Sequence, residues 1–315
     1  MGGCNAGTNS FCDDEIWCAS VIPVCEQVKP LRILPLRFIL RSAGLNFPGF
    51  SGATWHGGLG MILAQQSPTA FRSLYQTNQE SRLYALLPTM ESSVPIGGVL
   101  ELRVTLFGAG VDHALAVTQA IAELGRIGMR PGGYYEMIES RIIHPDEEIT
   151  FMSEKAGFLS VPRALTTQDY LTSDSTLINA CRMKIVTPLR IKEGNDLLRN
   201  APGYSKVLRR IFSRIDQIAH VADEAPPFVK SMREEIYGEA DRVVIKSSNI
   251  SLHAMERRSA RSGQQMQFNG IVGTIDYTGE MKYTLPLLKL ASMTQLGGKT
   301  AFGFGGLEIE VSGQV

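Results

Sequence analysis

The two halves of this sequence repeat one order of strand-like and helix-like patterns. In the N-terminal half, alternating apolar residues predict strands at 31–40, 98–107 and 134–143. Helical spacing predicts helices at 54–66 and from Asp112 to either Gly125 or Gly128. This order of elements fits the βαββαβ unit of a ferredoxin-like domain.

The C-terminal half shows the same order again. It runs as a strand at 181–191, a helix at 204–221, strands at 242–252 and 267–277, a helix at 285–292 and a strand at 306–311. Only the order of elements repeats, because the residues themselves do not align between the halves. We therefore predict an α+β fold with two ferredoxin-like (RRM-like) βαββαβ domains in tandem and a C-terminal glycine-rich loop.

The length of 315 residues suits two domains of ordinary size. The predicted division has four parts. They are a variable N-terminal extension at 1–30, an N-terminal ferredoxin-like domain at 31–145, a linker at 146–180, and a C-terminal ferredoxin-like domain with the glycine-rich loop at 181–315.

Four of the five cysteines lie before residue 26, and the fifth is Cys181. Their spacing matches no common zinc module and contains no CxxC pair, so we expect neither a metal site nor a cofactor. No secretory signal pattern and no apolar run long enough to cross a bilayer is evident. We therefore expect a cytoplasmic protein with reduced thiols and no membrane partner.

The basic and acidic residues balance at 31 each, which by itself argues against a nucleic-acid binder. Their distribution is uneven, however, because basic residues gather at 181–215 and again at 242–262. A solvated helix face explains the first cluster about as well as a nucleic-acid surface does. It explains the second cluster less well, because that cluster lies in a segment rich in serine and glycine.

The segment Gln295–Gly306 contains five glycines in twelve positions, with Lys299 and Thr300 among them. Backbone amides in such a loop can approach phosphate groups without interference from Cβ atoms. The Walker spacing is absent, and the segment fits the dinucleotide fingerprint poorly because a predicted strand follows the loop rather than a helix. Taken alone, the segment fits a purely structural turn equally well.

Several further motifs accompany this loop in a fixed order. They are Leu34-Pro-Leu-Arg37, Phe50-Ser-Gly-Ala-Thr-Trp-His-Gly-Gly-Leu-Gly60, Thr187-Pro-Leu-Arg190, the basic helix Leu208–Ile215, Arg257-Arg-Ser259, Gly270-Ile-Val-Gly273 with Gly279, Leu285-Pro-Leu-Leu288, and Gly298-Lys-Thr-Ala-Phe-Gly-Phe-Gly305. In order and spacing they resemble the CRISPR precursor-RNA processing endoribonucleases of the RAMP superfamily, most strongly over 181–311. The sequence departs from that family at His56-Gly57, where the family more often has Arg-Gly.

The resemblance implies metal-independent cleavage of CRISPR repeat RNA, which yields a mature guide RNA. In this reaction a ribose 2′-hydroxyl attacks the adjacent phosphate and leaves a cyclic phosphate. The chemistry requires a base, an acid and positive charge around the phosphoryl oxygens. The candidate catalytic residues are His56, Lys299, Tyr135 and His253. His56 is favoured as the base, since it opens a predicted helix whose dipole favours the neutral imidazole.

The candidate RNA-binding residues come from the basic clusters and from the loop. They are Arg190, Arg209, Arg210, Arg214, Arg257, Arg258, Arg261, Gly297, Gly298, Thr300, Gly303 and Gly305. The expected partners are CRISPR repeat RNA, the mature guide RNA and other subunits of a CRISPR effector complex. Two alternatives remain open. One is a non-catalytic RAMP subunit that binds the repeat-derived end of a guide RNA, and the other is an unrelated ferredoxin-like enzyme that binds a nucleotide.

Overall fold

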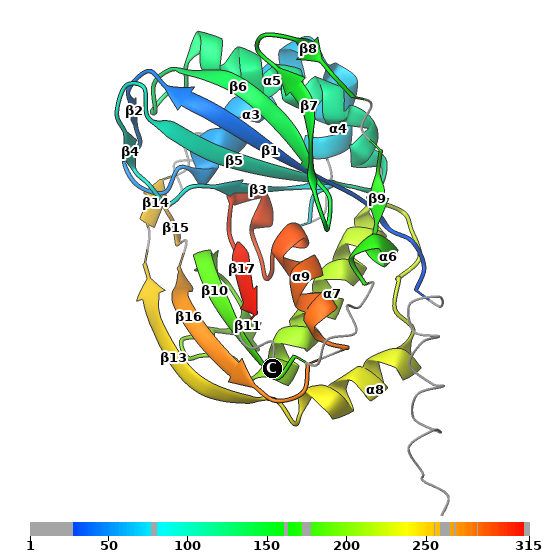
Figure 1. Cartoon of the computed structure of the whole chain (residues 1–315). Helices are drawn as coiled ribbons and strands as arrows, with labels where there is room; N and C mark the ends of the chain where they lie inside the picture. The colour runs from blue at the N-terminus through cyan, green and yellow to red at the C-terminus, as the bar shows by residue number, and fades with distance from the viewer. Residues whose placement is uncertain are drawn as a thin grey trace, which may run out of the picture.

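Two antiparallel sheets, each covered by helices on one face, form the framework of the chain (Figure 1). The computed structural model describes residues 28–76, 81–160, 163–171, 178–254, 256–258, 265–267, 269–281 and 283–311. Nearly all of the predicted N-terminal extension lies outside these residues. Within them, no helix is both long enough and apolar enough to span a membrane.

The N-terminal sheet is built around β1. Its elements, in chain order, are β1 (Arg32–Ser42), α3 (Gly52–Gln66), α4 (Pro68–Tyr75), β3 (Tyr84–Pro88), β5 (Val99–Phe107), a 3-10 turn η1 (Gly108–His113), α5 (Ala114–Ile127) and β6 (Tyr135–Ile143). A small pair, β2 (Leu45–Asn46) and β4 (Ser93–Val94), lies beside it. The strands are ordered β3-β5-β1-β6, so the first strand of the unit lies between the third and the fourth. This is the strand order of a ferredoxin-like domain.

Alternation along β1 explains why the helices lie on one face. Leu34, Leu36, Phe38 and Leu40 are fully buried in a core shared with α3 and α5, whereas the side chain of Arg37 lies on the opposite face and pairs with Glu148.

The C-terminal sheet has the same arrangement. Its elements are β10 (Ala180–Leu189), β11 (Lys192–Glu193), β12 (Asp196–Leu197), α7 (Tyr204–Val221), α8 (Lys230–Ala240), β13 (Val244–His253), β14 (Glu256–Arg258), β15 (Gln265–Gln267), β16 (Gly270–Thr278), α9 (Leu285–Thr294), a 3-10 turn η2 (Thr300–Phe302) and β17 (Leu307–Val311). The main sheet is ordered β13-β16-β10-β17, which repeats the order of the N-terminal sheet. The predicted α+β fold with two ferredoxin-like units is therefore confirmed.

The structure also contains elements that the sequence patterns did not reveal. The strand β3 completes the N-terminal unit, and α4 and α8 extend the connections after α3 and α7. Helix α8 buries only Met232, Ile236 and Ala240, so its apolar stripe is narrow and its polar residues hide the helical period.

The predicted linker at 146–180 is largely structured. It supplies β7 (Glu148–Ser153) and β8 (Gly157–Phe158), which extend the N-terminal sheet beyond β6, and β9 (Leu165–Thr166), which pairs with β1. A short helix, α6 (Thr167–Tyr170), follows. Strands at a sheet edge are half solvated, so their apolar alternation is weak. The exact division of the chain into domains stays a prediction.

The glycine-rich loop between α9 and β17 joins the two units (Figure 1). Its Ala301 belongs to the core of the N-terminal unit. The side chain of Gln295, at the end of α9, donates a hydrogen bond of 2.5 Å to the carbonyl of Leu86 in β3. Arg103 in β5 donates one of 3.2 Å to the carbonyl of Ser292. The loop is therefore held at the junction of the two sheets.

Candidate active site

The glycine-rich loop is fastened along the end of strand β10. The amide of Gly305 donates to the Pro188 carbonyl at 3.0 Å, and the amide of Gly298 donates to the Arg190 carbonyl at 3.1 Å. The amide of Gly306 donates to the Thr187 hydroxyl at 2.8 Å. The Thr187–Arg190 segment thus serves as the support on which the loop is built.

Close packing explains why the loop requires glycine. Gly305 has a φ of +77°, and a Cβ atom there would lie 1.8 Å from the carbonyl oxygen of Leu296. Gly297 has a φ of +82°, and its Cβ would lie 2.4 Å from the carbonyl oxygen of Arg190. At both positions the positive φ disfavours any residue other than glycine, and a Cβ atom would have no room.

Three of the glycines predicted to bind RNA use their backbone amides in hydrogen bonds within the protein. The amides of Gly298, Gly303 and Gly305 donate to the carbonyls of Arg190, Thr300 and Pro188 respectively. A backbone N–H has a single proton, so an amide that is satisfied inside the protein does not serve a ligand equally well. These glycines shape the loop.

A groove of about 510 Å³ lies beside the loop, and we call it the basic groove. Its lining residues are Arg82, Arg190, Ile191, Lys192, Arg210, Ser213, Arg214, Gln217, Gly297, Gly298, Lys299, Ala301 and Phe302. The charged side chains in this lining are all basic. Several cations in one concave surface favour a polyanion such as a nucleic-acid backbone.

The structure brings part of the predicted RNA-binding set to this groove. Arg190, Arg210, Gly297 and Gly298 line it, together with the predicted catalytic Lys299. Arg190 donates a hydrogen bond of 3.1 Å to the carbonyl of Asn269, which fixes the direction of its guanidinium. Lys299 adopts a left-handed backbone conformation with a φ of 64°, at the start of η2.

Arg214 and Thr300 have a different role from the surface contacts predicted for them. Arg214 is only 3% exposed and lies in the floor of the groove. Its guanidinium donates to the Thr300 hydroxyl at 2.8 Å, the Ser81 hydroxyl at 3.3 Å and the Thr294 carbonyl at 3.4 Å. Burial lowers the pKa of Arg214 to about 10, so it stays protonated at neutral pH. Arg214 holds the loop against helix α7.

His56 lies on α3 next to the loop. Its ring centroid is 4.1 Å from that of Phe302, which lines the basic groove. Its Nδ1 atom is 2.7 Å from the Tyr84 hydroxyl, and the Tyr75 hydroxyl donates to its backbone carbonyl at 2.9 Å. The Nζ atom of Lys299 lies 5.9 Å from the same Phe302 ring. The predicted base, His56, and the predicted cation, Lys299, therefore both lie near the ring of Phe302.

The packing of α3 against the loop depends on a glycine. A Cβ atom at Gly52, the first residue of α3, would lie 2.0 Å from the carbonyl oxygen of Phe302. The absence of a side chain there lets the helix approach the loop and places His56, one turn later, beside Phe302.

Two of the predicted catalytic residues lie elsewhere. Tyr135 is 4% exposed, and its hydroxyl donates to the Ile121 carbonyl at 2.6 Å while its ring packs on Trp55. Burial raises the pKa of Tyr135 well above its usual value. It is a core residue, and the outward member of the tyrosine pair is Tyr134, which is 54% exposed. His253 ends β13, opposite Gly270, and is not part of the groove lining.

Of the remaining predicted arginines, Arg209 is not among the described residues that line the groove. Arg209 stacks on the ring of Tyr237 in α8, with its guanidinium carbon 3.9 Å from the ring centroid. Arg257 and Arg258 belong to β14, which pairs with β15, and nothing is described of their side chains. Arg261 lies outside the described residues.

The sequence reasoning missed four contributors to the site, namely Tyr75, Arg82, Tyr84 and Phe302. Phe302 lies inside the glycine-rich motif, so its position in the sequence was a usable signal. Tyr75, Arg82 and Tyr84 precede or begin β3, a strand that was not predicted, so no local pattern connected them with His56.

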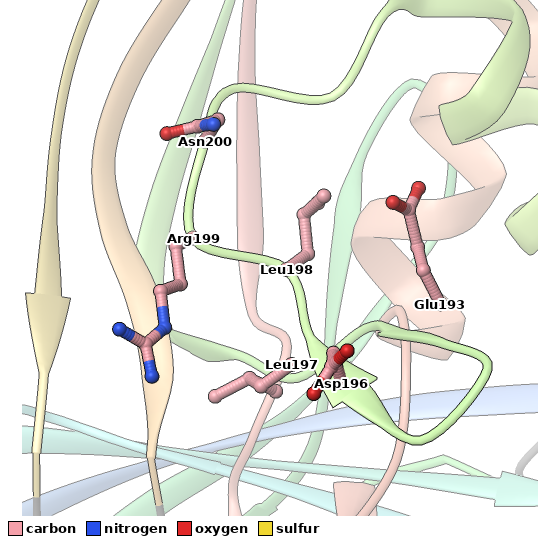
Figure 2. A pocket seen from close by; sticks show the side chains of 6 residues that line it. All are labelled: Glu193, Asp196, Leu197, Leu198, Arg199 and Asn200. Carbon is pink, nitrogen blue, oxygen red and sulfur yellow. The ribbon is translucent and has the colours of Figure 1, made fainter.

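A second hollow, of about 370 Å³, lies at the β11–β12 hairpin and the segment that follows it (Figure 2). Glu193 and Asp196 line it together with Arg199 and Asn200. Its carboxylates repel phosphate, so it suits an RNA backbone less well than the basic groove does. Among the residues that the structure describes, no group of three or more His, Cys, Asp or Glu side chains is arranged to hold a metal ion.

The structure thus combines two ferredoxin-like units with a glycine-rich loop beside a basic groove. Residues 183–307, from β10 to the start of β17, match the family described as CRISPR-associated endoribonuclease Cas6. This match, which covers the C-terminal unit, and the shared fold support the family expected from the sequence, the CRISPR repeat-processing endoribonucleases. No curated protein matches the chain.

Solved structures of Cas6 proteins share the fold over most of the chain. A Cas6 (TTHB231) product complex is 14% identical with a TM-score of 0.59, and the alignment covers 90% of this chain and 100% of that one. Cas6 (TTHB231) of Thermus thermophilus is 13% identical with a TM-score of 0.57, covering 89% and 99%. A Cas6 (TTHA0078) product complex is 15% identical with a TM-score of 0.56, covering 89% and 99%.

Proposed function

We propose that this protein is an endoribonuclease that cleaves CRISPR repeat RNA in the precursor transcript and so produces mature guide RNA. The observation that carries the proposal is the position of His56, whose ring packs on Phe302 at the wall of the basic groove. A group that can exchange a proton near neutral pH thus adjoins a surface suited to RNA phosphates. The family match and the Cas6 product complexes with the same fold support this substrate.

The proposed reaction is a transesterification that requires no metal ion. The 2′-oxygen of the ribose forms a bond to the adjacent phosphorus, and the bond from phosphorus to the 5′-oxygen of the next nucleotide breaks. The products are a cyclic phosphate and a free 5′-hydroxyl. One proton leaves the attacking hydroxyl and one proton is added to the leaving oxygen, so the reaction is balanced.

In this proposal His56 accepts the proton of the attacking hydroxyl through Nε2, the ring nitrogen opposite the one that Tyr84 contacts. The ammonium of Lys299 stabilises the negative charge that builds on the phosphoryl oxygens, and it contributes most where water is excluded. Arg82, Arg190, Lys192 and Arg210 hold the flanking phosphates along the groove.

The proposed partners follow from this activity. They are the CRISPR repeat RNA, the guide RNA that stays in the groove after cleavage, and other subunits of a CRISPR effector complex in the cytoplasm. One matching structure is a partial Cas6-RT-Cas1–Cas2 complex, which is 13% identical with a TM-score of 0.58 over 90% of this chain and 47% of that one.

The test uses purified protein and repeat RNA from the CRISPR array of the same genome, in the presence of EDTA. A second RNA carries a single deoxyribose at the scissile nucleotide, which removes the attacking hydroxyl. Cleavage of the first RNA alone, with a cyclic phosphate on the upstream product, is the expected result. Tight binding without cleavage would instead assign the chain as a non-catalytic RAMP subunit, and cleavage of the deoxyribose RNA would overturn the proposed mechanism.

His56→Ala tests the assignment of the base in the same assay. We expect it to bind RNA normally and to cleave at least about a hundredfold more slowly, because a positioned base contributes about 10²–10⁴ in rate. Full activity of this variant would remove His56 from the mechanism.

A further inference from the structure

One charged side chain is buried in the floor of the basic groove. Arg214 is 3% exposed, and in the part of the chain that the structure describes it is the only charged residue in the buried class. It lines the groove from helix α7, and its guanidinium carbon lies 5.6 Å from the ring centroid of Phe107. A charge removed from water destabilises the folded state unless an opposite charge or a full set of hydrogen bonds replaces the water. The contacts of Arg214 therefore decide how far the protein itself compensates this charge.

The partners of Arg214 satisfy only part of its guanidinium. Nη2 donates to the Thr300 hydroxyl at 2.8 Å, Nη1 to the Ser81 hydroxyl at 3.3 Å and Nε to the Thr294 carbonyl at 3.4 Å. A guanidinium carries five N–H groups, so one on Nη1 and one on Nη2 have no acceptor among the described residues. All three acceptors are uncharged. The hydrogen bonds are therefore incomplete, and the positive charge meets no negative one in this set.

Two other arginines with largely covered side chains are paired with carboxylates. Arg233, whose side chain is 19% exposed, donates to both carboxylate oxygens of Asp216 at 2.6 and 2.7 Å. Arg37, at 26%, lies 2.9 Å from the carboxylate of Glu148. Arg214 is more buried than either, and burial lowers its pKa to about 10 without a carboxylate that raises it again. A buried arginine without such a partner suggests that the opposite charge comes from a ligand.

The surroundings of Arg214 favour an anion as that ligand. The other charged side chains in the groove lining are all basic, namely Arg82, Arg190, Lys192, Arg210 and Lys299. Cations that line one concave surface raise the local concentration of anions. The positive field of the groove thus draws a negative group toward the place where Arg214 lies.

We propose that Arg214 forms an anion site in the floor of the basic groove and that a phosphate group of the bound repeat RNA is its counter-ion. The inference rests on the proposed function, because that function places the RNA in this groove. Phosphate oxygens accept hydrogen bonds from a guanidinium, which still has an N–H group to offer on each terminal nitrogen. Such a contact is stronger in a buried position than at the surface, because little water screens it.

The proposed site couples RNA binding to the junction of the two ferredoxin-like units. The same guanidinium reaches Thr300 in the glycine-rich loop and Ser81 just before the N-terminal strand β3. A phosphate bound to Arg214 compensates the buried charge only in the folded state, so it should stabilise the fold. An arginine that only supports the loop would not make stability depend on phosphate in this way.

The first experiment measures thermal unfolding of the purified full chain in increasing sodium phosphate, with sodium chloride added to keep the ionic strength constant. We expect the unfolding midpoint of the wild type to rise with phosphate concentration. In Arg214→Met most of this rise should be lost. Phosphate also stabilises proteins in general, so the difference between the two proteins carries the result. An equal rise in Arg214→Met would overturn the proposal.

Thr300→Val is the matched control, because it removes the hydrogen bond of 2.8 Å from the other side and leaves the charge of Arg214 in place. We expect a lower midpoint than in the wild type but an undiminished rise with phosphate. Arg214→Lys keeps a positive charge without the planar fork, so it should retain part of the rise. If Thr300→Val loses the rise as completely as Arg214→Met does, the position of the loop is responsible and the proposal is wrong.

The second experiment uses repeat RNA with a deoxyribose at the scissile nucleotide, which the proposed reaction does not cleave. We expect Arg214→Met to bind it about thirtyfold or more weakly, as for other buried charge pairs that lose one partner. The ratio of the two affinities should persist in high salt, since a buried contact is poorly screened. Saturating RNA should also abolish the Arg214-dependent response of the wild type to phosphate.

The two experiments separate this inference from the proposed function. If Arg214→Met loses the phosphate response but binds the RNA as tightly as the wild type, the site holds a small free anion and RNA is not its ligand. If the phosphate and RNA results are both as expected but the wild type does not cleave ordinary repeat RNA, the anion site is real and the proposed nuclease activity is wrong.

Discussion

The guanidinium of Arg214, buried in helix α7, donates a hydrogen bond of 2.8 Å to the hydroxyl of Thr300 in the glycine-rich loop. The same group reaches Ser81, just before the N-terminal strand β3, and the carbonyl of Thr294 at the end of α9. One side chain thus connects the loop to both ferredoxin-like units. Its charge faces no carboxylate in these bonds, and the acceptors are two hydroxyls and one carbonyl.

Arg214→Met tests this connection. Methionine fills similar space but leaves the three acceptors without their donor, so we expect the free energy of unfolding in urea to fall by about 2 kcal/mol. The variant also removes the buried charge of Arg214, whose desolvation destabilises the folded state and lowers its pKa. This gain limits the loss of unfolding free energy. A variant as stable as the wild type would show that the bonds add nothing to stability.

Arg210→Ala is the counterpart, because Arg210 lies one turn earlier on α7 and lines the basic groove without being buried. We expect little change in the free energy of unfolding. We expect weaker RNA binding and a slope of log Kd against log salt that is smaller by about 1, since one phosphate contact is lost. An unchanged salt slope would place the RNA outside this groove.

Lys299 carries a side chain proposed to act in catalysis on a backbone conformation that is unfavourable for residues other than glycine. Its φ of 64° lies in the left-handed region, where a residue with a Cβ atom costs about 1–2 kcal/mol relative to glycine. We therefore expect Lys299→Gly to be more stable than Lys299→Ala by about 1 kcal/mol in thermal or urea unfolding. Both variants lack the ammonium, so both should cleave repeat RNA more slowly and to a similar extent. Normal cleavage by either variant would remove Lys299 from the active site.

Two glycines of α3 make a matched pair for the packing of the loop. Gly52→Ala forces a methyl group to within 2.0 Å of the Phe302 carbonyl, so the helix and the loop must separate. We expect a loss of about 2 kcal/mol or more in unfolding free energy, as for other overpacked sites, together with slower cleavage as Phe302 moves from His56. Gly57→Ala meets nothing within 4 Å and should stabilise the helix by about 0.5–1 kcal/mol. Equal stabilities for the two variants would contradict the observed packing.

Much of the fold could be predicted because the relevant patterns are local. The apolar residues of α7 recur at helical spacing and end where the helix ends, at Val221, so the predicted bounds at 204–221 are those of the structure. The strand β3 carries no such signal, since Tyr84 to Leu86 form a continuous buried run without alternation. The ferredoxin-like fold could still be predicted because the order of the other elements along the chain was sufficient to indicate it.

The site could be predicted only in part, because its chemistry depends on contacts between distant segments. His56 and Lys299 were found from residue type and local glycine context, whereas the contact of His56 with Tyr84 arises only when α3 packs against β3. The sequence could not show that the amides of Gly298, Gly303 and Gly305 bond within the protein, because a phosphate cradle and a tightly packed turn have the same sequence signature. Arg214 and Arg210 share a face of α7, so the sequence does not distinguish them. In the structure the glycine-rich loop covers Arg214, which supports the loop, whereas Arg210 lines the basic groove.

The carboxylate of Asp276 gives a prediction for how the free energy of unfolding changes at acidic pH. Arg182 and then Ser247 hydrogen-bond to its carboxylate and hold its pKa below the usual value, which joins β10, β16 and β13 across the sheet. A carboxylate whose pKa is lowered in the folded state adds stability above its unfolded pKa of 3.8, and this contribution is lost as the pH falls through the lower, folded value.

We therefore expect Asp276→Asn to be less stable than the wild type at neutral pH, with the difference shrinking as the pH falls below about 4. Urea unfolding at several pH values measures this. Because the carboxylate is near the surface, the difference should be small and should also decrease in high salt. A difference that stays constant from neutral pH to the acid end would show that the variant acts through packing and not through the charge of Asp276.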